Sequence, residues 1–193
     1  MNPSDRIKLF RLSHEIVERE LDAVERTFNI DLGRDSADEQ DKDQEYYPQF
    51  EEAVRKEARI MGAHYELFYC LEKSIRSLIK SKLNAEHGAN WWDTNVPQLI
   101  QKDVSENMKR EIDSGVTPRS QEKIDYTTFG QLGDIVRHNW QTFIDTFSSE
   151  KAFTRIMNNL NVLRGPIAHC SPLVTDEVVR LRLTVKDWFR LME

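Results

Sequence analysis

The sequence contains little cysteine and little glycine. Its two cysteines, Cys70 and Cys170, are too few for a disulfide scaffold and lack a Cys-x-x-Cys spacing for a metal. We therefore expect each to be buried as a small hydrophobic side chain. No histidine pair is spaced at i and i+3 or i+4, so no metal site or cofactor is predicted and a metalloenzyme is disfavoured. The histidines are His14, His64, His87, His138 and His169.

Long hydrophobic runs are also absent. No apolar stretch approaches the length needed to cross a bilayer, so we expect no membrane partner. Residues 1–20, MNPSDRIKLFRLSHEIVERE, are charged from residue 5 onward and lack the apolar core of a secretion signal. The sequence therefore predicts a cytoplasmic protein.

The chain is acidic, with a formal net charge of -6, which disfavours the coating of nucleic acid by bulk electrostatics. Most of this charge lies in residues 31–45, where seven acidic residues outnumber Arg34 and Lys42 and give a net charge of -5. Because the segment has few apolar residues, we interpret it as a solvated linker, with an acidic partner-binding tail as the alternative.

Apolar residues recur with helical spacing, and no segment alternates with the period of a strand, so the sequence predicts an all-α bundle. A long helix is predicted over residues 49–86, with Val54 and Tyr65 among the residues of its apolar stripe. We predict an amphipathic N-terminal helical arm over residues 1–30, the acidic linker over 31–45 and the bundle over 46–193.

Further helices are predicted along the bundle. One begins at Val96-Pro97 and carries Leu99, Ile100, Val104 and Met108 on one side. A polar surface connection over residues 113–126 separates it from two short helical pieces within residues 126–147. Ser148 or Ser149 caps the next helix, which carries Arg164, and Thr175 is a cap candidate for the last helix.

The segment RGPIAH places Arg164 and His169 five residues apart. Arginine is a forked, permanent cation that clamps phosphate, and histidine takes and gives protons near neutrality, so the pair suits metal-free cleavage of RNA. We expect the Gly165-Pro166 step to kink or restart the helix and to aim both side chains into one cleft. The spacing recurs at Arg59 and His64 inside a helical run, where side chains five apart diverge.

Each of the following residues has both a structural and a functional interpretation. Arg164 and His169 also fit an ordinary helix C-terminus, where positive side chains favour the helix dipole. Trp91 and Trp92 are interpreted as core residues, with stacking on unpaired bases as the alternative. Glu72 is interpreted as part of a solvated or interhelical face, with the orientation of a motif residue as the alternative.

Three segments in this order resemble a known superfamily. They are WWDTNVP (residues 91–97), YTTFGQLGDIV (126–136) and NNLNVLRGPIAHC (158–170). Together they resemble the HEPN domains, helical bundles marked by an arginine, four to six residues and a histidine. Within that superfamily they look like the subgroup found also at the end of a nuclear RNA-surveillance endonuclease.

The resemblance implies a metal-independent endoribonuclease without a cofactor, acting at a composite site formed by a homodimer. Arg164 and His169 inherit the catalytic roles and RNA is the substrate, cut to 2',3'-cyclic phosphate ends. Gly165 stands where such domains usually have a polar residue, and Asn161 is our candidate to supply one for substrate binding. A toxin or phage-defence ribonuclease is the expected role, with an inhibitor or trigger protein as a further partner. The alternative is a non-catalytic HEPN-like dimerisation module that binds a nucleotide or RNA.

Overall fold

The structure is a computed structural model, and it describes residues 17, 20–21, 23–25, 27–28 and 47–193. Every regular element within these residues is a helix, which confirms the predicted all-α fold. None of the described helices is long and apolar enough to cross a membrane. The chain divides into two compact units, Met1–Glu51 and Glu52–Glu193, and each is described by itself.

In the first unit, all described residues from 17 to 28 are helical, within the predicted arm. Three of its apolar side chains, Val17, Val24 and Phe28, are exposed. The short 3-10 helix η1 (Tyr47–Gln49) follows. The predicted linker over residues 31–45 lies outside the described residues, so the division into arm, linker and bundle stays a prediction.

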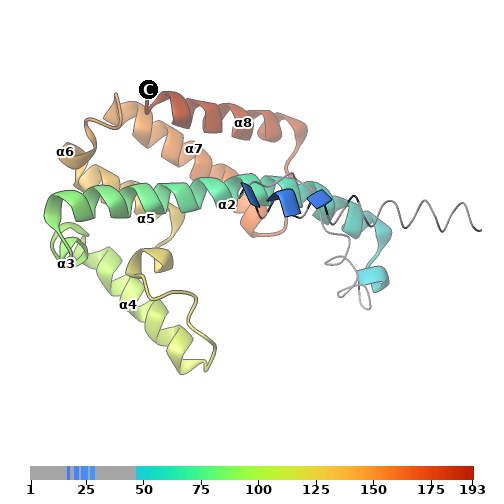
Figure 1. Ribbon diagram of the computed structural model, residues 1–193, viewed down its shortest axis with the longest axis horizontal. Helices are drawn as coiled ribbons and strands as arrows, with labels where there is room; N and C mark the ends of the chain where they lie inside the picture. Colours follow the sequence, from blue (N-terminus) through green and yellow to red (C-terminus); the bar gives the residue numbers. More distant parts are fainter. Residues whose placement is uncertain (1–16, 18–19, 22, 26, 29–46) are drawn as a thin grey trace, which may run out of the picture. The chain divides into compact units, whose positions relative to one another are not determined.

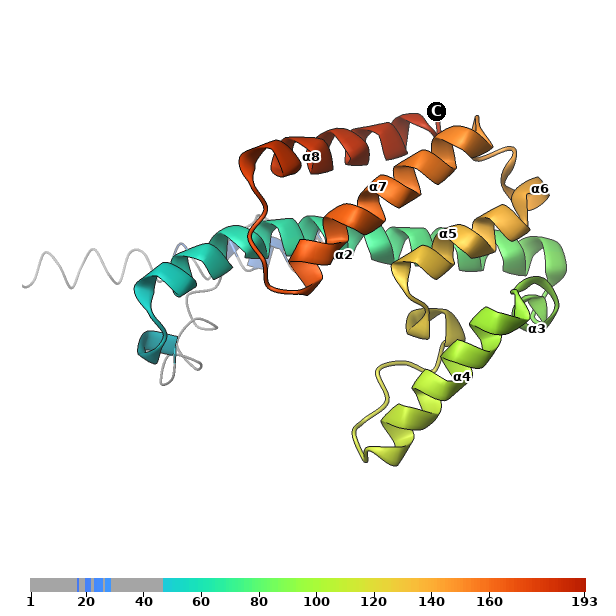
Figure 2. The same cartoon turned by 180° about the vertical axis from the view of Figure 1, so that it is seen from behind.

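The second unit is built from seven α-helices and one 3-10 helix. In chain order they are α2 (Glu52–His87), α3 (Trp91–Asn95), α4 (Gln98–Asp113), η2 (Lys123–Tyr126), α5 (Phe129–His138), α6 (Trp140–Phe143), α7 (Glu150–Ala168) and α8 (Thr175–Arg190). Figures 1 and 2 show α7 and α8 on one side of α2 and α4 on the opposite side. α7 packs against α8, α5 and α2, and α4 packs against η2.

The 36-residue helix α2 confirms the long predicted helix. Its buried side chains follow one stripe, and they are His64, Phe68, Leu71, Ile75, Arg76, Ile79 and Leu83. The prediction placed Val54 and Tyr65 on this face, but both are exposed, because the buried row passes through His64 instead. α2 ends before Gly88, which has a φ of 72°, a conformation that suits glycine.

The structure confirms some predicted core positions and corrects others. Trp91 and Trp92 are buried with ring centroids 5.5 Å apart, so they are core residues. Leu99 of α4 is exposed, although the prediction placed it on the same side of the helix as Ile100 and Val104, which are buried. The segment predicted as a surface connection ends in the 3-10 helix η2, whose Ile124 and Tyr126 side chains are buried. The prediction missed this short buried turn because the two apolar residues stand in a polar sequence without helical periodicity.

Capping interactions fix where the helices near the site begin. The Thr128 hydroxyl accepts a hydrogen bond from the amide of Gln131, whose side chain in turn accepts from the Thr128 amide, a complete capping box for α5. Ser149 caps α7, since its hydroxyl accepts a 3.3 Å hydrogen bond from the Ala152 amide. Of the two predicted caps, Ser148 and Ser149, the second is therefore confirmed. Thr175 is the first residue of α8 and does not cap it, because Val174 occupies the cap position.

Candidate functional site

The helix that carries Arg164 continues through the Gly165-Pro166 step and ends at Ala168. The predicted restart at this step is therefore wrong. Pro166 has no amide hydrogen, so only the bond to the carbonyl of Val162 is lost, and Val162 is exposed, where water can replace the missing donor.

A compact turn closes α7 directly after this step. The amide of Ser171 donates to the carbonyl of Pro166 at 2.9 Å, and that of His169 donates to Gly165 at 3.0 Å. Cys170 between them has a φ of 53°, so the end has the form of a Schellman motif with cysteine in the left-handed position that glycine usually takes.

Arg164 points from α7 toward α2, where its Nε lies 3.7 Å from Oε2 of Glu72. The Glu72 side chain is only 19% exposed, whereas that of Arg164 is 41% exposed. The other carboxylate oxygen of Glu72 accepts a hydrogen bond from Arg76, one turn further along α2. Glu72 therefore makes an interhelical contact between α2 and α7, as the favoured interpretation predicts, and its role in orienting the motif arginine stays a prediction.

Arg76 is a buried anchor for this arrangement, with a side chain 10% exposed. It donates to the hydroxyl of Thr127 at 2.7 Å and to the carbonyl of Thr127 at 3.0 Å, and it also donates to the carbonyl of Ile124. These acceptors satisfy the guanidinium and fix its position between α2 and the η2 to α5 connection. The contacts run from a buried turn through Arg76 and Glu72 to Arg164.

A pocket with a volume of about 470 Å³ opens beside Arg164. It combines aromatic, cationic and acidic side chains from α2, the η2 region and α7. Its lining residues are Tyr65, Phe68, Tyr69, Glu72, Lys73, Arg76, Arg119, Asp125, Thr127, Arg164, Ile167 and Ala168. Four basic residues against two acidic residues give the lining a formal charge of +2, and Glu111, which pairs with Arg119, lowers the local sum to +1. The pocket therefore favours anions although the whole chain is acidic.

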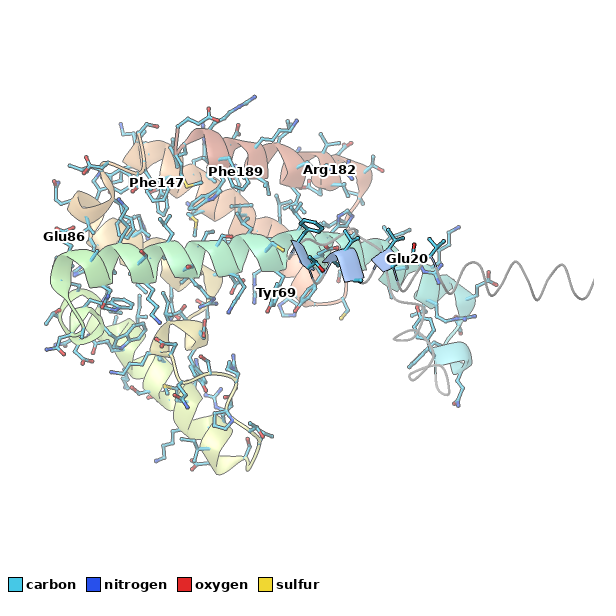
Figure 3. All side chains as sticks on the ribbon, in the orientation of Figure 1. Glu20, Tyr69, Glu86, Phe147, Arg182 and Phe189 are labelled. Carbon is cyan, nitrogen blue, oxygen red and sulfur yellow. The ribbon has the colours of Figure 1, made fainter. Side chains whose placement is uncertain are left out.

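Two exposed tyrosines form part of this pocket. Tyr65 and Tyr69 lie one turn apart on α2, with ring centroids 6.0 Å apart and ring planes inclined by 36°. Figure 3 labels Tyr69 on α2, and its ring and the Arg164 guanidinium line the same pocket. The apolar stripe of the helix predicts Tyr65 in the core, but Tyr65 lines this pocket, and no sequence pattern predicts a role for Tyr69.

Neither His169 nor Asn161 lines the Arg164 pocket. His169 is exposed and is not among the residues that line the Arg164 pocket. This pocket of a single chain therefore does not bring the two motif residues together, and their expected convergence in one cleft stays a prediction. Asn161 is exposed beside α5, where its Nδ2 would lie 3.8 Å from a Cβ added to Gly130. The second arginine-histidine match diverges, because His64 is buried and Arg59 is exposed.

Arg119 completes the rim of the pocket through a second polar cluster. Its backbone amide donates to Glu111 at 3.1 Å, its side chain donates to the same carboxylate, and the Tyr126 hydroxyl donates to Glu111 at 2.9 Å. The hydrogen bond from the Arg119 backbone amide is the main cause that lowers the pKa of Glu111. Burial, followed by the bond to Glu111, raises the pKa of Tyr126. The cluster therefore keeps Glu111 charged and Tyr126 neutral near pH 7.

The described residues contain no group of three or more His, Cys, Asp or Glu side chains that could hold a metal ion. Cys70 and Cys170 are both exposed, so the prediction that they are buried is wrong. Cys70 lies on the outer face of α2 and Cys170 lies in the turn that ends α7, and neither position faces the core.

The helical spacing of the pocket residues on α2 is visible in the sequence. Tyr65, Tyr69 and Lys73 are spaced at i, i+4 and i+8, and Glu72 and Arg76 at i and i+4, so all five border one side of the helix. The spacing alone did not show that this side faces the end of α7. That contact joins Glu72 to Arg164, which are far apart in the sequence.

Comparison with known proteins identifies the family. The family model described as Swt1-like HEPN matches residues 66–193, which is more than half of the chain and includes α7 with Arg164 and His169. No curated protein and no solved structure matches the sequence. The match confirms the resemblance, and the chain belongs to the Swt1-like HEPN family.

Proposed function

We propose that this protein is a metal-independent endoribonuclease whose active site forms where two copies bring together Arg164 and His169. The observation that carries the proposal is the placement of Arg164, which is half-exposed in a cationic pocket and held there by Glu72. A guanidinium in this position can clamp a phosphate. Membership of the HEPN family supports a ribonuclease or nucleotide-binding function.

The placement of the two motif residues favours a site made by two chains. Within one copy, His169 is not among the residues that line the Arg164 pocket, so a single copy does not supply both an acid and a base to a phosphate there. His169 is exposed and is free to reach a phosphate held by a second copy. A homodimer is therefore part of the proposal.

The chemistry needs one base and one acid. His169 of one copy takes the proton from a ribose 2'-hydroxyl, and the 2'-oxygen forms a bond to phosphorus. The bond from phosphorus to the 5'-oxygen breaks, and that oxygen takes a proton from the protonated His169 of the other copy. Arg164 stabilises the negative charge that develops on the phosphate. The products carry a 2',3'-cyclic phosphate and a 5'-hydroxyl.

The test is an RNA-end assay on purified protein in the presence of a chelator. The wild type should produce these two ends, and His169→Ala should be slower by about 10² to 10⁴ with its fold intact, as expected for loss of acid-base help. Arg164→Ala should also lose activity. His138→Ala and Arg182→Ala are matched controls, because both residues are exposed and lie outside the pocket. Equal cutting by all preparations, or a requirement for Mg²⁺, would contradict the proposal.

A mixing experiment tests the composite site. When a large excess of inactive His169→Ala exchanges subunits with the wild type, most wild-type chains enter mixed dimers that lack one histidine. The activity should then fall well below the level given by dilution alone, whereas a site within a single copy predicts no such fall. Sedimentation of the wild type should show a dimer.

A second candidate function is a non-catalytic module that binds a nucleotide or RNA. The ion pair from Glu72, which offsets part of the Arg164 charge, and the absence of His169 from the pocket favour it. Gly165 after the arginine also favours it. Binding of RNA without any difference in products between the wild type and Arg164→Ala would select this function.

The proposed biological role is that of a toxin or phage-defence ribonuclease in the cytoplasm. Its targets are then transfer, messenger or ribosomal RNA, and an inhibitor or trigger protein controls it. Induced expression of the wild type, but not of His169→Ala, should stop growth of the host. Unchanged growth with intact cellular RNA would contradict this role.

A further inference from the structure

The outer edge of α2 carries an aromatic pair next to a cation. Tyr65, Tyr69 and Lys73 follow each other at intervals of four residues, which places them in one row with a rise of about 6 Å between neighbours. Tyr65 is 58% exposed and Tyr69 is 53% exposed. Each ring therefore presents a large part of its surface to solvent.

These rings are not needed to complete the core. The core beneath them is filled by Phe68, which is buried and contacts Phe129 with ring centroids 5.1 Å apart. Tyr65 and Tyr69 instead contact each other and line the pocket beside Arg164. An exposed aromatic pair next to cations has the chemistry of a surface that binds a base and its phosphate.

We propose that Tyr65 and Tyr69 form a stacking platform for an unpaired base of single-stranded RNA, with its phosphate held by Arg164 and Lys73. This inference rests on the proposed function and specifies its substrate class. A base inside a duplex has both faces covered by its neighbours, so it cannot stack on a tyrosine ring without leaving the helix. The platform therefore selects single strands, loops and ends.

The charges of the pocket agree with this ligand. Lys73 is 56% exposed and lies 4.0 Å from Asp125, a loose contact that a phosphate can replace. Arg164 is held by Glu72 at one edge of its guanidinium and leaves the remainder accessible. Arg76, by contrast, is satisfied by buried acceptors and serves as a support for the site.

The experiment measures RNA binding with the His169→Ala protein, which keeps the RNA uncut. The probes are a short fluorescein-labelled oligoadenylate and a blunt RNA duplex of the same length, compared at one salt concentration. The single strand should bind more tightly than the duplex. Tyr69→Ala should weaken single-strand binding by about fivefold to a hundredfold, the range that alanine substitution of a stacking aromatic gives. Tyr69→Phe, which keeps the ring, should bind like the parent.

Phe189→Ala is the matched control. Phe189 is an exposed aromatic residue on α8, labelled in Figure 3, and it does not line the pocket. Its removal should leave the affinity unchanged. Tyr65→Ala should follow Tyr69→Ala, and Lys73→Ala should weaken binding and reduce its dependence on salt.

The outcomes separate this inference from the proposed nuclease. In one outcome the wild type cuts RNA, but adding Tyr69→Ala to the His169→Ala protein does not change its affinity for single-stranded RNA. The stacking platform is then wrong and the proposed nuclease stands. If the wild type does not cut but binding depends on the Tyr69 ring, the platform stands alone. If Tyr69→Ala abolishes dimerisation in sedimentation and leaves RNA affinity unchanged, the tyrosines belong to an interface between copies and the inference is overturned.

Discussion

Glu72 contacts two arginines that differ in burial, and this difference predicts unequal contributions to stability. Two double-mutant cycles measure them, one combining Glu72→Gln with Arg76→Met and one combining it with Arg164→Met. Each cycle compares the single and double variants, so the loss of the partner's other contacts cancels. The coupling energy that remains describes the pair itself.

The geometry sets the expected magnitudes. The hydrogen bond from Arg76 to Glu72 is charge-assisted and both side chains are largely buried, so its coupling should be about 1.5–3 kcal/mol. The Arg164 pair is longer, at 3.7 Å, and the arginine is nearly half exposed. Solvent screening reduces such a pair to about 0.2–1 kcal/mol. Arg76 is thus a structural partner of Glu72, and Arg164 remains available to a ligand.

Urea unfolding followed by circular dichroism provides the free energies. The Arg164 coupling should also fall in 1 M salt, where the screening length is about 3 Å, and the Arg76 coupling should persist. Arg182→Met, which changes an exposed arginine of α8, should combine additively with Glu72→Gln. A coupling of Arg164 to Glu72 as large as that of Arg76 would refute the reasoning and would make Arg164 a structural residue.

Three further predictions concern stability. Cys170 has a φ of 53°, so Cys170→Gly should raise the free energy of unfolding by about 0.5–1 kcal/mol, whereas Gly88→Ala at φ 72° should lower it. The same sign for both would contradict the backbone argument. Thr128→Ala removes the capping box and should cost about 1 kcal/mol in urea unfolding, and an unchanged midpoint would contradict this. The lowered pKa of Glu111 stabilises the fold above its ordinary value of 4.5, and this contribution disappears as pH falls through the lowered pKa. Acid titration of Glu111→Gln should therefore show a shallower loss of stability below pH 4.5, and an identical profile would contradict it.

The helices could be predicted because they depend on local spacing. The predicted helix over residues 49–86 corresponds to α2 (Glu52–His87), and the motif that carries Arg164 lies at the predicted end of α7. The face of α2 that meets the core was harder to predict from the sequence. Tyr65 and His64 are neighbours separated by about 100° around the helix, and hydrophobicity alone favoured the tyrosine although the histidine is buried.

The conformation of the motif could not be predicted from the Gly165-Pro166 step alone. Proline disrupts a helix by removing one amide donor and crowding the carbonyl four residues earlier. The bond that Pro166 removes is to the carbonyl of Val162, an exposed residue, where water can replace the missing amide donor. The earlier part of α7 is held by burial of Phe153, Leu160 and Leu163, which keeps the helix regular up to the proline.

The charge of the whole chain is a poor guide to the charge of its pocket. A net charge of -6 disfavours general adhesion to nucleic acid, but a bound phosphate responds mainly to charges within about 8 Å at physiological ionic strength. The lining of the Arg164 pocket contributes four basic and two acidic side chains. Two of the basic residues, Arg164 and Lys73, come from different helices, so only the folded chain brings them together. An acidic protein can therefore hold a cationic pocket, and the proposed binding of RNA there should weaken with added salt because it releases counterions from the phosphates.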